Sequence, residues 1–312
     1  MPRLLILSKQ ADKYNKLIDE AKLPQLKLVS ISSVTEAGST GAGCEIVFGE
    51  PSLIRKVLPA LTNLHWVQST WAGVEPLLDP SLRRDYALTN ARGVFGELMS
   101  EYVFGYLLAH ERRIFERYQA QQERRWDNAV TGMLRGKTIG LLGVGSIGAH
   151  LAATAKHFRM TVRGYTRASE DCPGVDVYYH GDELLEFARG LDYLVSVLPN
   201  TSVTHHIVNA NLLNSLPSYA IFINVGRGSA VDETALVEVL ETGKIAGAVL
   251  DVFEQEPLPQ VHPFWTTPNL LLTFHTSAPS LPEDLAFLFA ENYLRFINGE
   301  ELKYRVDFER GY

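Results

Sequence analysis

Short apolar runs alternate with longer amphipathic segments along the chain, a pattern typical of βα units built on parallel sheets. In the first hundred residues, four apolar runs predict strands at 4–7, 26–31, 45–48 and 64–67. Helical periodicity between these runs predicts helices at 11–22 and 51–61. This part of the sequence therefore predicts one small α/β domain.

A second α/β series follows a predicted long helix at 96–120. The series contains six predicted strands, at 138–142, 161–165, 193–198, 220–225, 246–252 and 270–274. Six strands in βα alternation form a complete dinucleotide-binding sheet. We expect the charged segment 111–125 to be a solvated or subunit-facing surface, and a last helix at 282–297 to return the chain to the first domain.

Composition narrows the class of protein. A chain of 312 residues exceeds what one hydrophobic core usually supports, so two domains are expected. The apolar content of 46% and charged content of 21% are those of a soluble globular protein, and the net charge of −7 argues against nucleic-acid binding. No apolar run reaches the ~18 residues of a membrane span, and the N-terminal run is too short for a signal peptide, so we expect a cytoplasmic protein.

Metal and disulfide chemistry is not expected from the cysteines. Cys44 and Cys172 are far apart in the sequence and have no metal-ligand spacing, so neither a disulfide framework nor a zinc site is predicted.

A glycine-rich turn lies between an apolar strand and the start of a helix. Its glycines are Gly143, Gly145 and Gly148, and Ser146 and Ile147 begin the helix. In this setting the first glycine permits a tight turn, the second lets the backbone approach a pyrophosphate, and the third allows close helix–strand packing. The turn therefore predicts a dinucleotide site with its phosphates at the helix N-terminus.

The end of the next strand discriminates between cofactors. NAD-binding chains usually place a carboxylate there for the ribose 2′-hydroxyl, whereas this strand ends in Thr166 and Arg167. A guanidinium suits a 2′-phosphate, so we expect NADP(H) to be preferred and NAD(H) to be possible. The alternative is that Arg167 is an ordinary surface residue and that both cofactors are used.

Three strand ends in the second series carry Arg227, Glu256 and His275. Reduction of a 2-oxo acid needs a cation that binds the substrate carboxylate. It also needs a histidine that acts as the acid, paired with a carboxylate of the protein. Arg227 lies between two glycines, which predicts a sterically open loop. Asp251 is expected to hold the nicotinamide amide. Each residue alone could be a strand-end histidine, a surface ion pair or a solvated carboxylate, but together behind a nucleotide motif they favour catalysis.

Longer motifs extend this interpretation. They are GVGSIG at 143–148, VLPNT at 197–201, NVGRGSAVDETAL at 224–236, GAVLDVFEQEPLP at 247–259 and ERGY at 309–312. With these motifs the chain resembles the D-isomer-specific 2-hydroxyacid dehydrogenase family, and within it the glyoxylate/hydroxypyruvate reductases.

The resemblance implies a fold and a set of roles. It implies two Rossmann-like domains, with a doubly wound parallel-sheet NAD(P)-binding domain (99–278) inserted into a smaller flavodoxin-like substrate domain (1–98 plus 279–312). It assigns Arg227 to the substrate carboxylate and carbonyl, Glu256 to the histidine, and His275 to proton donation. Substrate would react in the interdomain cleft, and family members pair as homodimers through the long helix and the adjacent loop. Further cofactor contacts are expected from Leu198, Pro199, Val225 and Gly226.

The segment 68–75 matches the family loop whose backbone amides hold the substrate carboxylate. Those amides would belong to Ala72, Gly73 and Val74. Trp71 replaces a glycine of the usual family pattern, and its side chain either shapes the pocket or packs beneath the loop. Phe274 stands where the family commonly has proline before the histidine.

The leading hypothesis is therefore an oxidoreductase that transfers a hydride from NAD(P)H to a small 2-oxo acid of the glyoxylate or hydroxypyruvate type, giving the D-2-hydroxy acid. One alternative is a dehydrogenase of the same family that acts on a bulkier 2-oxo acid. Another is a non-catalytic NAD(H)-sensing protein of the same fold. The retention of both Arg227 and His275 favours an enzyme.

Overall fold

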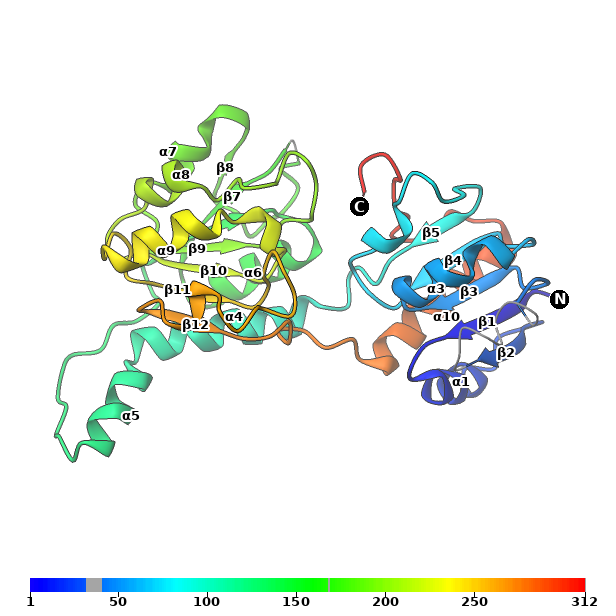
Figure 1. Cartoon of the computed structure of the whole chain (residues 1–312), viewed down its shortest axis with the longest axis horizontal. Coiled ribbons are helices and arrows are strands. Elements are labelled where there is room, and N and C mark those ends of the chain that lie inside the picture. The colour runs from blue at the N-terminus through cyan, green and yellow to red at the C-terminus, as the bar shows by residue number, and fades with distance from the viewer. Residues whose placement is uncertain (32–40, 168, 312) are drawn as a thin grey trace. The chain divides into compact units, whose positions relative to one another are not determined.

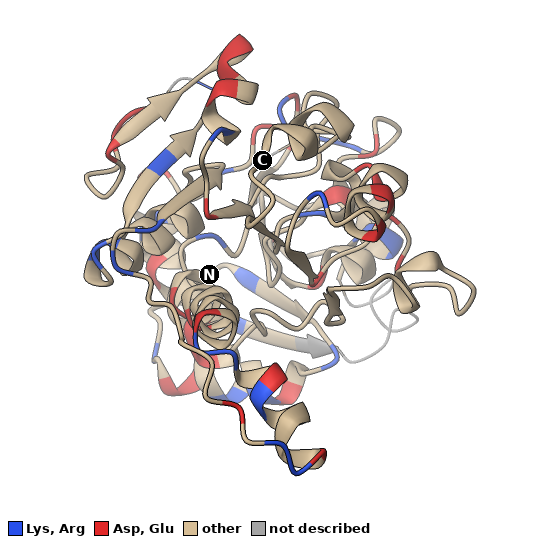
Figure 2. Cartoon of the chain, turned by 90° about the vertical axis from the view of Figure 1, so that its left-hand side faces the viewer, with Lys and Arg blue, Asp and Glu red and all other residues tan. Residues whose placement is uncertain are grey.

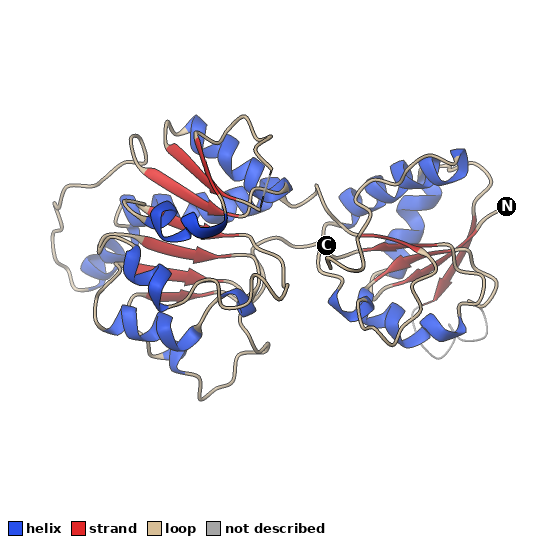
Figure 3. Cartoon of the chain, turned by 90° about the horizontal axis from the view of Figure 1, so that it is seen from above, coloured by secondary structure: helices blue, strands red, loops and turns tan. Residues whose placement is uncertain are grey.

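The computed structural model describes residues 1–31, 41–167 and 169–311. The chain divides into two compact units, one formed by Met1–Val94 with Ser280–Tyr312 and the other by Phe95–Pro279. The second unit is thus inserted into the chain of the first. Each unit is built on one parallel sheet with helices packed against it (Figure 3).

The sheet of the first unit has five strands in the order β2-β1-β3-β4-β5. Its strands are β1 (Arg3–Leu7), β2 (Lys27–Ile31), β3 (Ile46–Gly49), β4 (Trp66–Ser69) and β5 (Ala87–Thr89). All neighbouring pairs are parallel. This is the flavodoxin-like strand order, so the predicted fold class of this unit is confirmed. The three-residue strand β5 is not predicted by the apolar pattern.

The helices of the first unit come from both ends of the chain. They are α1 (Ala11–Glu20), α3 (Pro51–Val57), α10 (Pro282–Asn298) and the short 3₁₀ turns η1 (Leu58–Ala60) and η2 (Glu75–Leu77). Helix α10 packs on the sheet, where Phe289 stacks on Trp66 of β4 at 5.3 Å between ring centroids. Asn292 of α10 donates a hydrogen bond of 3.0 Å to the buried Gln68 side chain, which ties α10 to the end of β4.

The sheet of the second unit has seven strands in the order β12-β11-β10-β9-β6-β7-β8. They are β6 (Thr138–Leu142), β7 (Thr161–Tyr165), β8 (Val177–Tyr179), β9 (Tyr193–Ser196), β10 (Ile221–Asn224), β11 (Gly247–Leu250) and β12 (Leu270–Leu272). Counted from β6, this is the dinucleotide-binding order 3-2-1-4-5-6 with one more strand at the edge. The predicted doubly wound parallel sheet is confirmed, with β8 as a strand that the prediction lacks.

Helices cover both faces of this sheet (Figures 1 and 3). They are α4 (Gly96–Glu111), α5 (Ile114–Gln122), α6 (Ser146–His157), α7 (Leu184–Ala188), α8 (Ala210–Ser215) and α9 (Glu233–Glu241), with 3₁₀ turns η3 (Gly181–Glu183), η4 (Gly228–Ala230) and η5 (Pro263–Trp265). One apolar core joins the sheet to α4 and α6, and a second joins it to α7, α8 and α9. Two cores on opposite faces explain why most of the strands are continuous apolar runs.

The prediction of one helix over 96–120 is wrong. Helix α4 ends at Glu111, Arg113 takes a left-handed conformation with φ of 54°, and α5 begins at Ile114. A residue with positive φ cannot continue an α-helix, so α5 leaves the sheet in a new direction (Figure 1). The charged segment is not uniformly solvated either, because Glu111 is buried and accepts a hydrogen bond from the Tyr193 hydroxyl.

The distribution of charge and the character of the helices bear on nucleic-acid and membrane binding. Basic and acidic residues are interspersed along both units rather than gathered into a basic stripe, within the part of the chain that is described (Figure 2). Among the same residues, no helix combines the length and apolar character that crossing a bilayer requires.

Candidate active site

The three residues predicted to be catalytic follow three neighbouring strands. Arg227 follows β10, Glu256 follows β11 and His275 follows β12, and these strands lie side by side in the sheet. Because the strands are parallel, their carboxyl ends meet at one edge, where doubly wound sheets place their ligands. The fold therefore brings the three side chains to the same edge of the second unit.

His275 and Glu256 form a direct pair. Nδ1 of His275 lies 2.7 Å from a carboxylate oxygen of Glu256, whose other oxygen accepts a hydrogen bond of 3.0 Å from the Phe253 amide. An ionised carboxylate only accepts hydrogen bonds, so Nδ1 carries the proton of this contact and Nε2 points elsewhere. The His275 side chain is 57% exposed within the described chain. Nε2 is thus available to a substrate while Glu256 orients the ring.

Asp251 holds the loop that carries His275. This fully buried carboxylate accepts hydrogen bonds from the Thr273 hydroxyl at 2.5 Å, the Thr276 amide at 2.9 Å and the Ser277 amide at 3.0 Å. Burial acts to raise the pKa of Asp251, but the hydrogen bonds from Ser277, Thr273 and Thr276 outweigh it and hold the pKa below its usual value. Asp251 therefore stays ionised and holds the chain on both sides of His275, through the Thr273 hydroxyl before it and the Thr276 and Ser277 amides after it. His275 itself has a positive φ of 57°.

The sequence predicted a sterically open loop around Arg227, and this prediction is wrong. A Cβ on Gly226 would lie 2.7 Å from backbone atoms of Leu198, and one on Gly228 would lie 1.8 Å from the Phe253 carbonyl carbon. Glycine is needed here because two neighbouring loops press against this backbone. Buried Asn224 completes the turn, since its side chain donates to the Arg227 carbonyl at 2.9 Å and accepts from the Gly226 amide at 3.1 Å.

The glycine-rich turn has the geometry that a dinucleotide site needs. Gly143 adopts φ of 97°, which favours glycine, and a Cβ on Gly148 would lie 2.3 Å from the Gly143 carbonyl oxygen. Gly145 is the N-cap of α6, so the amides of Ser146, Ile147 and Gly148 lie in the first helical turn, where backbone N–H groups lack helical acceptors. Such an N-terminus attracts anionic phosphates.

The loops after β9 and β10 lie beside this turn. Val197 donates to the Leu142 carbonyl at the end of β6, and the side chains of Val197 and Leu198 approach Gly143. Pro199 accepts a hydrogen bond of 2.7 Å from Thr204, and Val225 donates to Ser196 at 3.1 Å. The predicted cofactor residues Leu198, Pro199, Val225 and Gly226 are thus gathered at the point where the strand order reverses, between β6 and β9.

The end of β7 carries Thr166 and Arg167. Arg167 is exposed, and the Thr166 hydroxyl donates to the Ser169 carbonyl. Nδ1 of His180 lies 2.9 Å from the Thr166 carbonyl, and its Nε2 lies 2.8 Å from Glu170. The hydrogen bond to Glu170, followed by that to Thr166, raises the pKa of His180. The carboxylate nearest in sequence to Arg167 is therefore engaged with a histidine.

In the first unit, the loop after β4 presents backbone amides. The amides of Ala72, Gly73 and Val74 donate to no acceptor in the described part of the chain. The loop is held on both sides, because Trp71 exchanges hydrogen bonds with the Ser69 hydroxyl and Asn90 donates to the Ala72 carbonyl at 2.9 Å. Trp71 is 43% exposed, so its side chain lies at the surface of its unit rather than beneath the loop.

Sequence reasoning missed the residues that hold the site in place. Asn224 and Thr273 are polar residues at the ends of apolar strands, and Tyr102 of α4 reaches the Thr273 hydroxyl at 2.6 Å. The signal in the sequence that could have identified them is a polar residue at the end of an apolar strand. Its partners become visible only once the loops are placed in space.

Comparisons with known proteins agree with this geometry. Residues 104–277 match the family described as D-isomer specific 2-hydroxyacid dehydrogenase, NAD binding domain. A glyoxylate/hydroxypyruvate reductase A from Yersinia enterocolitica is 32% identical over 265 residues, covering 83% of this chain and 85% of the relative.

Two solved structures are also similar over nearly the whole chain. A D-isomer specific 2-hydroxyacid dehydrogenase family protein from Aeromonas salmonicida is 44% identical with a TM-score of 0.92, covering 98% of this chain and 99% of the other. A D-isomer specific 2-hydroxyacid dehydrogenase from Xanthobacter autotrophicus, solved with NADPH and MES, is 30% identical with a TM-score of 0.89 and covers 100% and 99% of the two chains. The predicted resemblance is confirmed, and the chain belongs to the D-isomer specific 2-hydroxyacid dehydrogenase family.

Proposed function

We propose that this enzyme reduces a small 2-oxo acid of the glyoxylate or hydroxypyruvate type to the D-2-hydroxy acid, with NADPH as the hydride source. The observation that carries the proposal is the His275–Glu256 pair at 2.7 Å, on the same sheet edge as Arg227 and the glycine-rich turn. The name of the Yersinia relative, glyoxylate/hydroxypyruvate reductase A, supports the substrate class.

The proposed chemistry divides the reaction among three side chains. NADPH supplies the hydride to the substrate carbonyl carbon. Protonated His275 donates its Nε2 proton to the carbonyl oxygen as negative charge develops there, and Glu256 stabilises the imidazolium through Nδ1. Arg227 binds the substrate carboxylate and carbonyl through its planar guanidinium, which polarises the carbonyl for attack.

The first unit contributes the substrate-binding loop in this proposal. The amides of Ala72, Gly73 and Val74 would bind the carboxylate, because backbone donors that have no acceptor among the described residues form an anion-binding surface. Trp71, exposed beside them, would limit the size of the 2-oxo acid. On this basis Met1–Val94 with Ser280–Tyr312 is the substrate domain, and Phe95–Pro279 is the cofactor domain.

The cofactor assignment rests on the second unit. The N-terminus of α6 would hold the pyrophosphate, and Asp251 would hold the nicotinamide amide. Thr166 and Arg167 would bind the 2′-phosphate of NADPH, while Glu170 is hydrogen-bonded to His180. The Xanthobacter structure holds NADPH, which supports this preference, and NAD(H) would be used less well.

We also propose that the enzyme works in the cytoplasm as a homodimer paired through α5 and the loop that follows it. This arm leaves its own unit (Figure 1) and carries six exposed apolar side chains. They are Ile114, Phe115, Tyr118, Trp126, Val130 and Met133. A second copy of the chain that packs on this arm would bury them.

A substrate and cofactor panel tests the proposal. Purified enzyme is assayed for NADPH and NADH oxidation with glyoxylate, hydroxypyruvate, pyruvate, phenylpyruvate and 2-oxoisocaproate. The expected result is turnover with NADPH and the small acids, and chiral analysis of the product should give the D isomer. Turnover with only the two bulky acids would contradict the substrate class. Tight NADPH binding without turnover of any acid would overturn the enzyme assignment in favour of a cofactor-sensing protein.

A further inference from the structure

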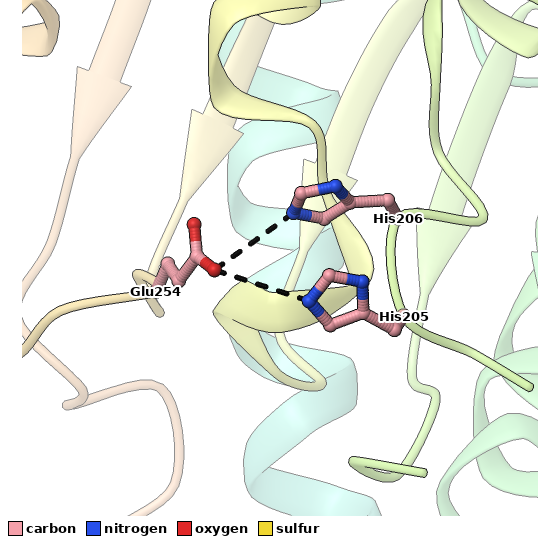
Figure 4. Close-up of side chains that lie close together, drawn as sticks. All are labelled: His205, His206 and Glu254. Atoms are coloured by element: carbon pink, nitrogen blue, oxygen red, sulfur yellow. Dashed lines mark ion pairs between the residues drawn. The ribbon is translucent and has the colours of Figure 1, made fainter. Parts of the chain in front are cut away.

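A cluster of two histidines and a glutamate, residue types that can ligate metals, lies outside the proposed catalytic triad. His205 and His206, in the loop between β9 and α8, both turn Nε2 toward one carboxylate oxygen of Glu254 (Figure 4). The two Nε2 atoms lie 4.0 Å and 3.8 Å from that oxygen. The three potential ligand atoms all lie within 4.8 Å of one another. These separations exceed a hydrogen bond, so neither Nε2 atom is hydrogen-bonded to Glu254.

His206 is held in a conformation that a histidine rarely adopts. Its φ is 49°, in the left-handed region, and its imidazole stacks on that of His205 with 4.0 Å between ring centroids. The Nε2 atom of His206 is buried, yet it has no hydrogen-bond partner among the described residues. A buried polar atom without a partner calls for an explanation, and binding of a cation would supply one. Its position facing Glu254 identifies where that ion would lie.

The backbone on both sides of the cluster is fixed before any ligand binds. The His206 amide donates to the Ser229 carbonyl at 2.9 Å, and Thr204 ties the preceding turn to Pro199. On the other side, the Glu254 amide donates to the Glu233 side chain at 3.1 Å. The Glu254 side chain itself is about half exposed, so its carboxylate has room to move toward the imidazoles on binding. Two imidazoles that face one carboxylate, on a backbone held by hydrogen bonds, suit ion capture.

We propose that His205, His206 and Glu254 bind one Zn²⁺ ion. Zinc bonds to histidine nitrogen and carboxylate oxygen are about 2.0–2.2 Å long, which places tetrahedral ligand atoms roughly 3.3 Å apart. The carboxylate therefore needs to approach the imidazoles by less than about 1 Å relative to the 3.8 Å and 4.0 Å separations. Two nitrogens and one oxygen leave a fourth position for water.

The ligand set and its surroundings select the kind of ion. Two imidazole nitrogens disfavour Mg²⁺ and Ca²⁺, which prefer oxygen ligands, and favour Zn²⁺ and other late transition metals. Asp232, Glu233 and Glu238 line the same hollow as His206 and Glu254, and their negative charge attracts a cation. Because His205, His206 and Glu254 are each partly exposed, the ion would exchange with solvent and bind reversibly.

Calorimetric titration of Zn²⁺ into EDTA-treated full-length enzyme tests the site. The expected result for the wild type is one ion per chain. His205→Gln, His206→Asn and Glu254→Gln should each weaken Zn²⁺ binding at least tenfold, which is about what loss of even an indirect metal partner costs. Asparagine tolerates the left-handed backbone at 206, so this variant removes the ligand without added strain. NADPH binding by each variant, measured in parallel, shows that the second unit is folded.

Two control variants separate this cluster from other histidine–carboxylate pairs. His262 lies 3.2 Å from Glu233, and His275 pairs with Glu256, so His262→Gln and His275→Ala remove competing sites. Both controls should bind Zn²⁺ as the wild type does. Co²⁺ added to the wild type should give the visible absorption of a four- or five-coordinate ion, and this absorption should disappear in His206→Asn. Absence of Zn²⁺ binding in the wild type, or binding that persists in the three ligand variants, would overturn the proposal.

Discussion

Replacement of Asp251 by asparagine tests whether one buried carboxylate holds the His275 loop. Asparagine has the shape of aspartate but exchanges one oxygen for an NH₂ group. In the better of its two orientations, the amide oxygen still accepts from Thr273 and Thr276, and the NH₂ group faces the Ser277 amide. That backbone N–H then loses its acceptor inside the protein.

The magnitude follows from the three hydrogen bonds. An unpaired buried N–H costs about 1–3 kcal/mol, and replacing a charged acceptor by a neutral one costs about 1 kcal/mol for each bond that remains. Asparagine is also cheaper to bury than a carboxylate, which opposes these losses. We expect Asp251→Asn to lower the free energy of unfolding of the second unit by about 2–4 kcal/mol.

The assay is urea unfolding of the cofactor-free enzyme, followed by circular dichroism. Asp232→Asn is the matched control, because Asp232 caps α9 by accepting from the Ala235 amide at 3.0 Å and asparagine caps helices equally well. Repeating the measurement in acid tests whether the stabilisation by Asp251 is lost at low pH, as its lowered pKa predicts. The pKa of Asp251 is lowered in the folded protein, so its stabilisation is complete above the ordinary aspartate pKa and is lost as pH falls through the folded value. Asp251→Asn should lack that acid-dependent loss.

The result that would refute this reasoning is specific. If cofactor-free Asp251→Asn unfolds at the same urea concentration as the wild type but binds NADPH weakly, Asp251 acts on the cofactor alone. The loop that carries His275 would then be held by other contacts.

Three further changes probe the cofactor half of the site, and a fourth, on α4, is a control. Arg167→Asp should reduce the kcat/KM ratio of NADPH to NADH by roughly 10–100-fold, the worth of a charged hydrogen bond, and an unchanged ratio would remove Arg167 from 2′-phosphate binding. Glu170→Gln should lower the raised pKa of His180 toward about 6.5 in an NMR titration. In the wild type the ion pair between His180 and Glu170 is present at acid pH and is lost as pH rises through the pKa of His180 in the folded protein. If Glu170→Gln leaves the pKa of His180 unchanged, the two residues do not pair in solution. Gly148→Ala should weaken NADPH binding and destabilise the enzyme by about 1–3 kcal/mol, because its Cβ would meet the Gly143 carbonyl oxygen at 2.3 Å. Gly105→Ala, in open space on α4, should instead stabilise by about 0.5–1 kcal/mol in thermal unfolding.

The sheets follow from sequence wherever a strand is a sustained apolar run. Strand β6 has its predicted bounds because the apolar residues that follow Lys137 stop at the glycine turn. Strands β5 and β8 are only three residues long, which is too short for a periodic signal. The break at Arg113 also has no signal, because no glycine or proline marks it and apolar spacing continues into α5.

For the candidate site, the sequence predicts which strand ends carry the residues but not how the loops around them pack. Parallel strands carry Arg227, Glu256 and His275 to one edge, so chain order alone places them in one neighbourhood. The close approach of Phe253 to Gly228, and the three hydrogen bonds of Asp251, join residues that are distant in sequence. Those contacts depend on loop conformation, which hydrophobic periodicity does not encode.

The central claim is that His275 donates the proton in a reduction driven by NADPH. Its most direct test is kcat with NADPH and glyoxylate for the wild type and for His275→Ala, with the NADPH dissociation constant of each measured by fluorescence titration. The account predicts that kcat falls about 10²–10⁴-fold while the affinity for NADPH is unchanged. A kcat for His275→Ala close to that of the wild type would contradict it.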